Sequence, residues 1–139
     1  MLVGSYLHNV DAKGRVFIPA KFRLDLGSRF YVYRSHDGCV RAYSEVEWSA
    51  VIEKLKNSTV KSNQVRRRIL STTVEVEMDT QGRVLIPEEL RAFAMIIEKV
   101  RIVGMAEWVE FWNPEKFDRV MNEDDEESDI ELMDQLGMC

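Results

Sequence analysis

The chain has 139 residues and a mass of 16.2 kDa, a length that fits one ordinary domain or two small modules packed as one unit. No apolar run approaches the roughly 18 residues of a membrane span, and the first residues lack the features of a secretion signal. We therefore expect a cytoplasmic protein without a membrane partner. Cys39 and Cys139 are too few and too far apart for a disulfide framework or a metal site.

The net charge of −5 is unevenly distributed along the chain. Residues 121–139 hold eight acidic side chains and no lysine or arginine, so the first 120 residues carry a net +3. A mildly basic body is compatible with nucleic-acid binding, whereas a strongly acidic tail is usually solvated and mobile. A less favoured alternative is that the tail competes for the basic face of its own protein.

The first half of the chain predicts short strands, a tight turn and short helices. Pro19 suits the first turn of a helix and Gly27 its end, and Ser44 with Glu47 forms a capping box. The expected elements are, in chain order, a strand over 2–10, a turn over 11–14, a strand over 15–18, a helix over 20–26, strands over 30–33 and 39–43, and a helix over 45–56.

The second half repeats the first. Residues 11–23 read DAKGRVFIPAKFR and residues 79–91 read DTQGRVLIPEELR, with seven identical positions at an offset of 68. A fixed internal period indicates a duplicated structural unit. The second copy is expected to contain a strand over 72–78, a turn over 79–82, a strand over 83–86, a helix over 87–94, strands over 100–103 and 108–112, and a helix from Pro114. Between the copies we expect a polar loop over 57–63 and a short helix over 64–70.

Each copy has too few strands to enclose a core alone. Two interleaved copies would close into a small barrel and remove the exposed strand edges. The predicted fold class is therefore mainly β with short helices, of α+β type, with two pseudo-symmetric modules.

The repeated turn Asp-x-x-Gly-Arg is the main candidate for chemistry. Its positions of interest are Asp11, Lys13, Arg15, Asp79, Gln81 and Arg83. Arginine presents a planar fork of donors that fits phosphate oxygens or the edge of guanine, and two such turns side by side would form a paired basic prong. The alternative is structural: each aspartate caps its own turn and pairs with the arginine of that turn, an exposed interaction worth about 0–1 kcal/mol.

Other basic residues are weaker candidates for sequence-independent phosphate contacts. They are Lys21, Arg23, Arg66, Arg67 and Arg68. The run at 66–68 is more simply a solvated helix face. The second copy has Glu89 where the first has Lys21, so the first turn is expected to be the stronger contact.

No catalytic arrangement is found in the sequence. His8 and His36 have no nucleophile partner at a suitable spacing, and no glycine-rich phosphate loop or zinc-binding helix motif occurs. We expect no enzyme activity, no catalytic residue, no metal, no cofactor and no small-molecule substrate.

The paired segments DAKGRVFIPAKFR and DTQGRVLIPEELR resemble the MraZ family, bacterial proteins of the SpoVT/AbrB-like group of DNA-binding folds. The resemblance covers residues 1 to about 119. It implies two swapped-hairpin modules in a double-split β-barrel, an octamer-like ring of identical subunits, and regulation of the division and cell-wall gene cluster, including the protein's own promoter. It also implies that Asp11 with Arg15, and Asp79 with Arg83, belong to DNA-contacting turns.

Our first hypothesis is a sequence-specific transcriptional regulator that is associated with the nucleoid and binds double-stranded DNA at promoter repeats. The expected organisation is a first module at 5–58, a polar and basic connector at 59–71, a second module at 72–119 and an acidic tail at 120–139. The alternative is a protein-interaction scaffold without direct DNA contact. Steep salt dependence of DNA binding would distinguish the two hypotheses.

Overall fold

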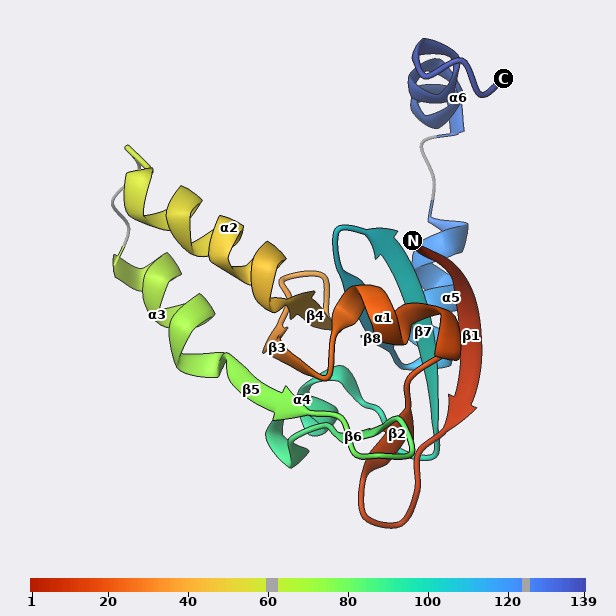
Figure 1. Ribbon diagram of the computed structural model, residues 1–139. Coiled ribbons are helices and arrows are strands. Elements are labelled where there is room, and N and C mark those ends of the chain that lie inside the picture. Colours follow the sequence, from red (N-terminus) through yellow and green to blue (C-terminus); the bar gives the residue numbers. More distant parts are fainter. Residues whose placement is uncertain (60–62, 124–125) are drawn as a thin grey trace.

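A computed structural model describes residues 1–59, 63–123 and 126–139 (Figure 1). The strands are β1 Leu2–Asn9, β2 Arg15–Phe17, β3 Arg29–Arg34, β4 Val40–Ser44, β5 Val74–Glu77, β6 Arg83–Leu85, β7 Lys99–Ala106 and β8 Val109–Trp112. The helices are α1 Ala20–Leu26, α2 Glu45–Asn57, α3 Asn63–Thr72, α4 Glu88–Ala94, α5 Pro114–Asn122 and α6 Glu126–Gln135. Residues 60–62 of the expected loop and 124–125 of the expected tail lie outside the described residues.

The order of elements agrees with the sequence prediction, including the capped start of α2, where Ser44 accepts a hydrogen bond from the backbone N–H of Glu47. Two differences stand out. Thr72 ends α3 and does not begin β5; its hydroxyl donates to the Arg68 carbonyl at 2.6 Å, the back-bond that a threonine makes within a helix. The acidic tail contains the helix α6, whose described side chains are exposed to solvent, as expected, but whose helical structure was not predicted.

The two copies are interleaved rather than side by side. The main sheet has the order β1-β7-β8-β4-β3-β5, and β2 pairs with β6 in a separate two-stranded ribbon. Within the sheet, β1 of the first copy pairs with β7 of the second, and β5 of the second pairs with β3 of the first. The counterparts in the two copies are β1 and β5, β3 and β7, and β4 and β8. Exchanging them gives the same strand order in reverse, so a pseudo-two-fold axis passes between β4 and β8 and between β2 and β6.

The predicted closed barrel is wrong. The sheet ends at β1 and β5, and the β2–β6 ribbon joins it through the isolated bridge between Val10 and Val16 rather than through a continuous ladder. The reason is local: Pro19 and Pro87 follow the ribbon strands closely, cannot donate to a ladder, and lead into α1 and α4. The ribbon is therefore too short to complete hydrogen bonding with both edge strands.

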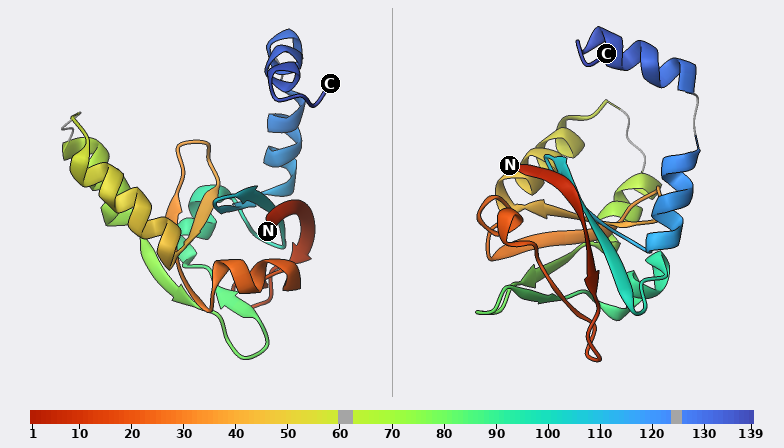
Figure 2. Two further views of the ribbon diagram at one scale, coloured as in Figure 1. Left: turned by 45° about the horizontal axis from the view of Figure 1, so that its top comes forward. Right: turned by 90° about the vertical axis from the view of Figure 1, so that its right-hand side faces the viewer.

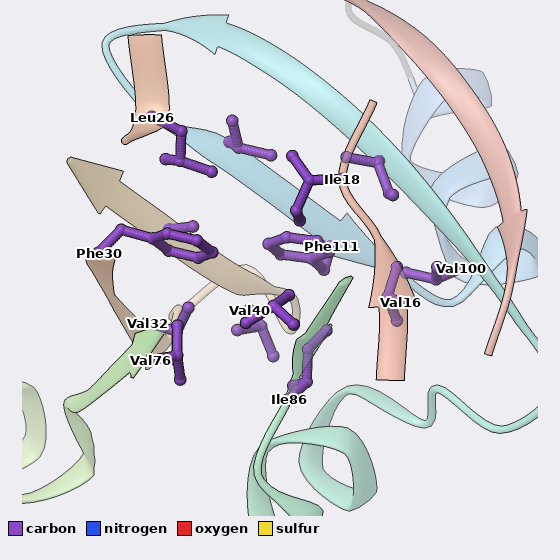
Figure 3. Packing of buried hydrophobic residues seen from close by; sticks show 14 of the residues in the cluster. Val16, Ile18, Leu26, Phe30, Val32, Val40, Val76, Ile86, Val100 and Phe111 are labelled. Carbon is purple, nitrogen blue, oxygen red and sulfur yellow. The ribbon is translucent and has the colours of Figure 1, made fainter. Parts of the chain in front are cut away.

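The ribbon packs across one face of the main sheet and closes the core with side chains instead of hydrogen bonds. Figure 3 shows Val16 of β2, and Ile18 and Ile86, which directly follow β2 and β6, in the core that the sheet residues Val40 and Phe111 line. All five side chains are at most 1% exposed. Burying aliphatic and aromatic side chains of this size contributes about 1.5–3 kcal/mol each, so the ribbon is firmly anchored although it is only three residue pairs long.

Both Asp-x-x-Gly-Arg turns lie at the end of the molecule that carries the ribbon, away from α6 (Figures 1 and 2). The first turn joins β1 to β2, and the second joins β5 to β6. The pairing of β2 with β6 thus brings together two segments that are 68 residues apart in the sequence. No helix among the described residues has the length and apolar character needed to cross a membrane.

Candidate nucleic-acid interface

Each turn is organised by its aspartate. One carboxylate oxygen of Asp11 accepts hydrogen bonds from the backbone N–H groups of Lys13 and Arg15, at 2.9 and 2.8 Å. The other oxygen accepts from the Arg15 Nε at 2.7 Å. This contact uses the Nε of the Arg15 guanidinium and not its two terminal nitrogens.

The second turn repeats these contacts. Asp79 accepts from the backbone N–H groups of Gln81 and Arg83, both at 2.9 Å, and from the Arg83 Nε at 2.8 Å. The structural role that the sequence offered as an alternative is therefore present in both copies. It does not exclude binding, because a guanidinium held through Nε still presents its remaining donors in a fixed orientation.

The hydrogen bonds also stabilise the charged form of each aspartate. The backbone N–H of Arg15 lowers the pKa of Asp11 below its ordinary value of 3.8, and the Arg15 guanidinium lowers it further, although desolvation opposes both effects. The pKa of Asp79 is lowered in the same way, first by the backbone N–H of Arg83. Both turns therefore keep an ionised aspartate, and hence an oriented arginine, throughout the neutral pH range.

The two arginines lie on the outer face of the ribbon. Arg15 is opposite Leu85 and Phe17 is opposite Arg83, whereas Val16 and Val84 point inward to the core. Phe17 and Leu85 are 46% and 52% exposed. The outer face thus combines two cations with two exposed apolar side chains.

Both arginines also line one hollow at the surface. The Arg83 guanidinium carbon lies 5.9 Å from the centre of the Phe17 ring, within the range of a cation–π contact, and His8 Nδ1 lies 2.8 Å from the Phe17 carbonyl oxygen. The residues that line the hollow are Leu7, His8, Asn9, Asp11, Arg15, Phe17 and Arg83. Residues from both copies therefore contribute to one surface, as the paired prong requires.

Lys13 and Gln81 occupy equivalent, exposed positions at the tips of the turns. Each contributes its backbone N–H to the aspartate of its turn, which leaves the side chain available for an external contact. The first tip therefore adds a positive charge beside Arg15, and the second adds an uncharged amide beside Arg83.

The weaker candidates are not all brought to this surface. Lys21 is exposed on α1. Arg23 is half-buried, and its Nε donates to the Ile18 carbonyl at 2.9 Å. On α3, Arg66 donates to the Leu55 carbonyl at 3.1 Å, and Arg67 and Arg68 are exposed. Helix α3 packs beside α2 in an arm that extends to one side of the body, away from the turn between β1 and β2 (Figure 1).

Three residues of this region are not among the predicted site residues: Phe17, Leu85 and Arg91. Phe17 and Leu85 lie in the predicted strands over 15–18 and 83–86. Strand alternation would have placed them outward, because their neighbours Val16 and Val84 fill the core. Arg91 repeats Arg23 at the last of the seven identical positions, and that recurrence was the signal for it.

Comparison with known proteins gives a consistent result. The sequence model of the MraZ protein family matches residues 1–70 and again 69–136. The chain belongs to the MraZ family. A protein named transcriptional regulator MraZ from Thermoanaerobacter pseudethanolicus is 41% identical over 99% of this chain and 100% of its own length. A protein of the same name from Caldanaerobacter subterraneus subsp. tengcongensis is 44% identical over 83% of this chain and 82% of its own length.

Membership of the MraZ family confirms the resemblance seen in the sequence. The family is one of transcriptional regulators and not of enzymes, which confirms the expectation that the chain is not an enzyme. Within the described part of the chain, no group of three or more histidine, cysteine, aspartate or glutamate side chains is placed to hold a metal ion.

Proposed function

We propose that this MraZ-family chain is a sequence-specific, DNA-binding transcriptional regulator, and that the outer face of the β2–β6 ribbon with its two turns is the DNA-contacting surface. The observation that carries the proposal is the convergence of Arg15 and Arg83 on one hollow, each with its guanidinium fixed by an aspartate. A prearranged donor fork loses little conformational freedom when it meets a phosphate or a guanine edge.

The proposal includes the promoter sites and the assembly. One subunit offers few contacts to DNA and should bind weakly. A ring-shaped homo-oligomer would present many copies to one duplex at high effective concentration. Short promoter boxes repeated at about 10 bp, one helical turn, would suit such a ring. We propose that these boxes precede the division and cell-wall gene cluster, including the protein's own gene, and that the protein is cytoplasmic and associated with the nucleoid.

Residues 5–58 and 72–119 are proposed as the two SpoVT/AbrB-like modules, with 59–71 as connector and 120–139 as tail. The interleaved strand pairing supports a swapped arrangement, because each module's first strand pairs with a strand of the other. In this arrangement neither module would form the DNA-contacting ribbon alone, since β2 and β6 come from different modules.

The test is binding of the full-length protein to the DNA upstream of its own gene, measured by fluorescence anisotropy at several salt concentrations. The double variant Arg15→Ala/Arg83→Ala should bind at least about 30-fold more weakly, because each arginine contact with DNA is worth roughly 1–3 kcal/mol. Affinity of the unsubstituted protein should fall steeply as salt rises, since phosphate contacts release counterions.

The matched control is Arg119→Ala, which removes an exposed arginine on α5, outside the ribbon surface. The control should bind DNA as the unsubstituted protein does, and all variants should elute at the same size in gel filtration. Equal affinity of the double variant and the control would overturn the proposed surface. Absence of DNA retention by the unsubstituted protein at low salt would favour the scaffold alternative.

A further inference from the structure

We propose that Arg23 and Arg91 are positioning residues that act across the pseudo-two-fold: the arginine of each copy holds the turn of the other copy in its binding shape. The inference rests on the proposed function for its DNA readout, but its structural part is independent of DNA. Arg23 lies on α1 of the first copy and Arg91 on α4 of the second.

The Arg23 guanidinium packs against the backbone of the second turn. An ideal Cβ built on Gly82 would collide with the Arg23 Cζ, Nε and Nη1 atoms, so the guanidinium fills the space that a side chain at residue 82 would take. The Arg23 Nε donates to the Ile18 carbonyl, and the Ile18 N–H donates to the Gly82 carbonyl, both at 2.9 Å. Arg23, Ile18 and Gly82 thus form one connected contact between copies.

The Arg91 guanidinium packs in the same way against the first turn. A Cβ on Gly14 would lie 2.5 Å from the Arg91 Cζ and 2.6 Å from its Nη2. The Arg91 Nε donates to the Ile86 carbonyl at 2.9 Å. Two copies with different neighbouring sequences therefore make the same contact. This recurrence indicates that the contact belongs to the structure of the duplicated unit.

The contact uses properties that only arginine combines. A guanidinium is flat, so it can lie against the backbone of a glycine while Nε donates to a carbonyl in the plane of the group. Lysine has no Nε donor and no flat face. The glycine must also lack a side chain, and Gly14 and Gly82 have φ of +86° and +83°, a conformation that glycine adopts without strain.

The positions of these groups indicate what the contact does. Gly82 lies between Gln81, at the exposed tip, and Arg83, the proposed DNA contact, and its N–H donates to the Asp79 carbonyl at 3.0 Å. The Arg23 guanidinium packs against Gly82 and thereby restricts the conformations of residues 79–83. The same holds for Gly14 between Lys13 and Arg15. Arg23 therefore acts on DNA binding through residues 79–83, although in the sequence it lies close to the first turn.

The direct experiment is hydrogen–deuterium exchange of the full-length protein without DNA. In Arg23→Ala and Arg23→Lys, the amides of residues 79–83 should exchange about tenfold faster, because local opening of the turn becomes easier. Residues 11–15 should change by less than about twofold. In Arg91→Ala and Arg91→Lys, the amides of residues 11–15 should exchange about tenfold faster, and those of residues 79–83 should change by less than about twofold. Strand β4 is the internal reference, and its exchange should remain unchanged if the variants fold normally.

The second readout is DNA affinity in a double-mutant cycle. Arg23→Ala should add little to Arg83→Ala, because both act through the second turn, whereas its effect should multiply with that of Arg15→Ala. The variant Arg23→Lys separates positioning from direct phosphate contact. Positioning predicts that lysine fails to restore binding, and a phosphate contact predicts that lysine restores it.

Three results would overturn the proposal: faster exchange of 11–15 rather than 79–83 in the Arg23 variants, equal acceleration of both turns, or no acceleration. Restored DNA affinity in Arg23→Lys would also overturn it. If the unsubstituted protein does not bind DNA, the proposed function fails, but the exchange measurements still decide whether the cross-copy contact positions the turns.

Discussion

The two turns have the same internal geometry and different chemistry. In both, an aspartate accepts two backbone N–H groups and one arginine Nε, at distances that agree within 0.1 Å. The first turn has Lys13 at its tip and the second has Gln81. On the adjoining helices, the first copy has Lys21 where the second has Glu89.

This comparison indicates which positions the fold requires and which are free to vary. The positions that shape the turn are identical, whereas the exposed tip (Lys13 and Gln81) and one exposed helix position (Lys21 and Glu89) differ in charge. The apolar partners on the ribbon also differ, because Arg83 lies over the ring of Phe17 whereas Arg15 is opposite Leu85. A duplex that meets both turns would therefore encounter a more cationic half and a less cationic half.

The largest expected effect is a loss of promoter affinity that differs between the Arg15 and Arg83 variants. Arg15→Ala should weaken promoter binding by about 10- to 100-fold, and Arg83→Ala by less, because Lys13 makes the tip of the first turn cationic whereas Gln81 leaves the second tip uncharged. Titration of each variant with labelled promoter DNA measures both values. A larger loss for Arg83→Ala would reverse the ranking of the two turns.

A second prediction concerns the stability of the turns. Gly14→Ala and Gly82→Ala each strain a positive φ and push aside the guanidinium that packs against the glycine, which breaks the Nε hydrogen bond of that arginine. Each should lower the free energy of unfolding by roughly 2–4 kcal/mol. Gly27→Ala is the comparison variant: its backbone (φ +84°, ψ 166°) is also one that only glycine adopts freely, but the nearest neighbour of a Cβ there would be 3.7 Å away.

The Gly27→Ala variant should lose about 1–3 kcal/mol, the cost of the unfavourable backbone conformation alone, and therefore about 1 kcal/mol less than the variants at Gly14 and Gly82. Urea unfolding of the three variants makes the comparison. Equal losses in the free energy of unfolding for the variants at residues 14, 27 and 82 would show that displacing the packed guanidinium does not destabilise the protein.

A smaller effect is expected from exchanging the tips. Lys13→Gln should reduce the slope of log affinity against log salt by about 0.9 for each copy of the tip that contacts a phosphate, and Gln81→Lys should increase it by the same amount. Both residues are exposed, so neither change should affect stability. Unaltered slopes in both variants would place the tips outside the interface.

The smallest effect is the pH dependence of the aspartates. The folded-state pKa values of Asp11 and Asp79 are lowered from 3.8, so the ionised carboxylates contribute stability that is present above the unfolded-state pKa and is lost as the pH falls through the folded-state pKa. Turn structure should thus be constant from pH 7 to about pH 5 and weaken only below about pH 4.

Carboxyl chemical shifts measured by NMR during an acid titration would report both midpoints. A midpoint at or above 3.8 for either aspartate would contradict the hydrogen-bonded arrangement of that turn.

Much of the fold follows from local sequence signals. Proline after the ribbon strands, glycine at the positive-φ turn positions and the Ser44 cap each have a single structural meaning, and the corresponding elements are where the sequence predicts them. The shortage of strands in each copy predicted interleaved copies in a closed barrel; the pairing of β1 with β7 and of β3 with β5 agrees with interleaving, and the barrel does not close.

Long-range features were harder to predict. Closure of the barrel depends on how far β2 and β6 extend along the sheet edges, and Pro19 and Pro87, which shorten them, predict only the starts of α1 and α4 when they are taken alone. The role of Arg23 could not be read from spacing, because Arg23 is nearer in sequence to Gly14 than to Gly82, whereas the interleaved fold places it against Gly82. Helix α6 was missed because a run of acidic residues is usual in solvated, unstructured tails.

The most direct test of the central claim is site-specific photo-crosslinking to promoter DNA. A photoreactive amino acid would replace Lys13, Gln81 or Arg119 in separate samples of the full-length protein. The proposed surface predicts crosslinks to DNA from positions 13 and 81 and none from position 119. Crosslinks from position 119 without any from 13 or 81 would contradict it.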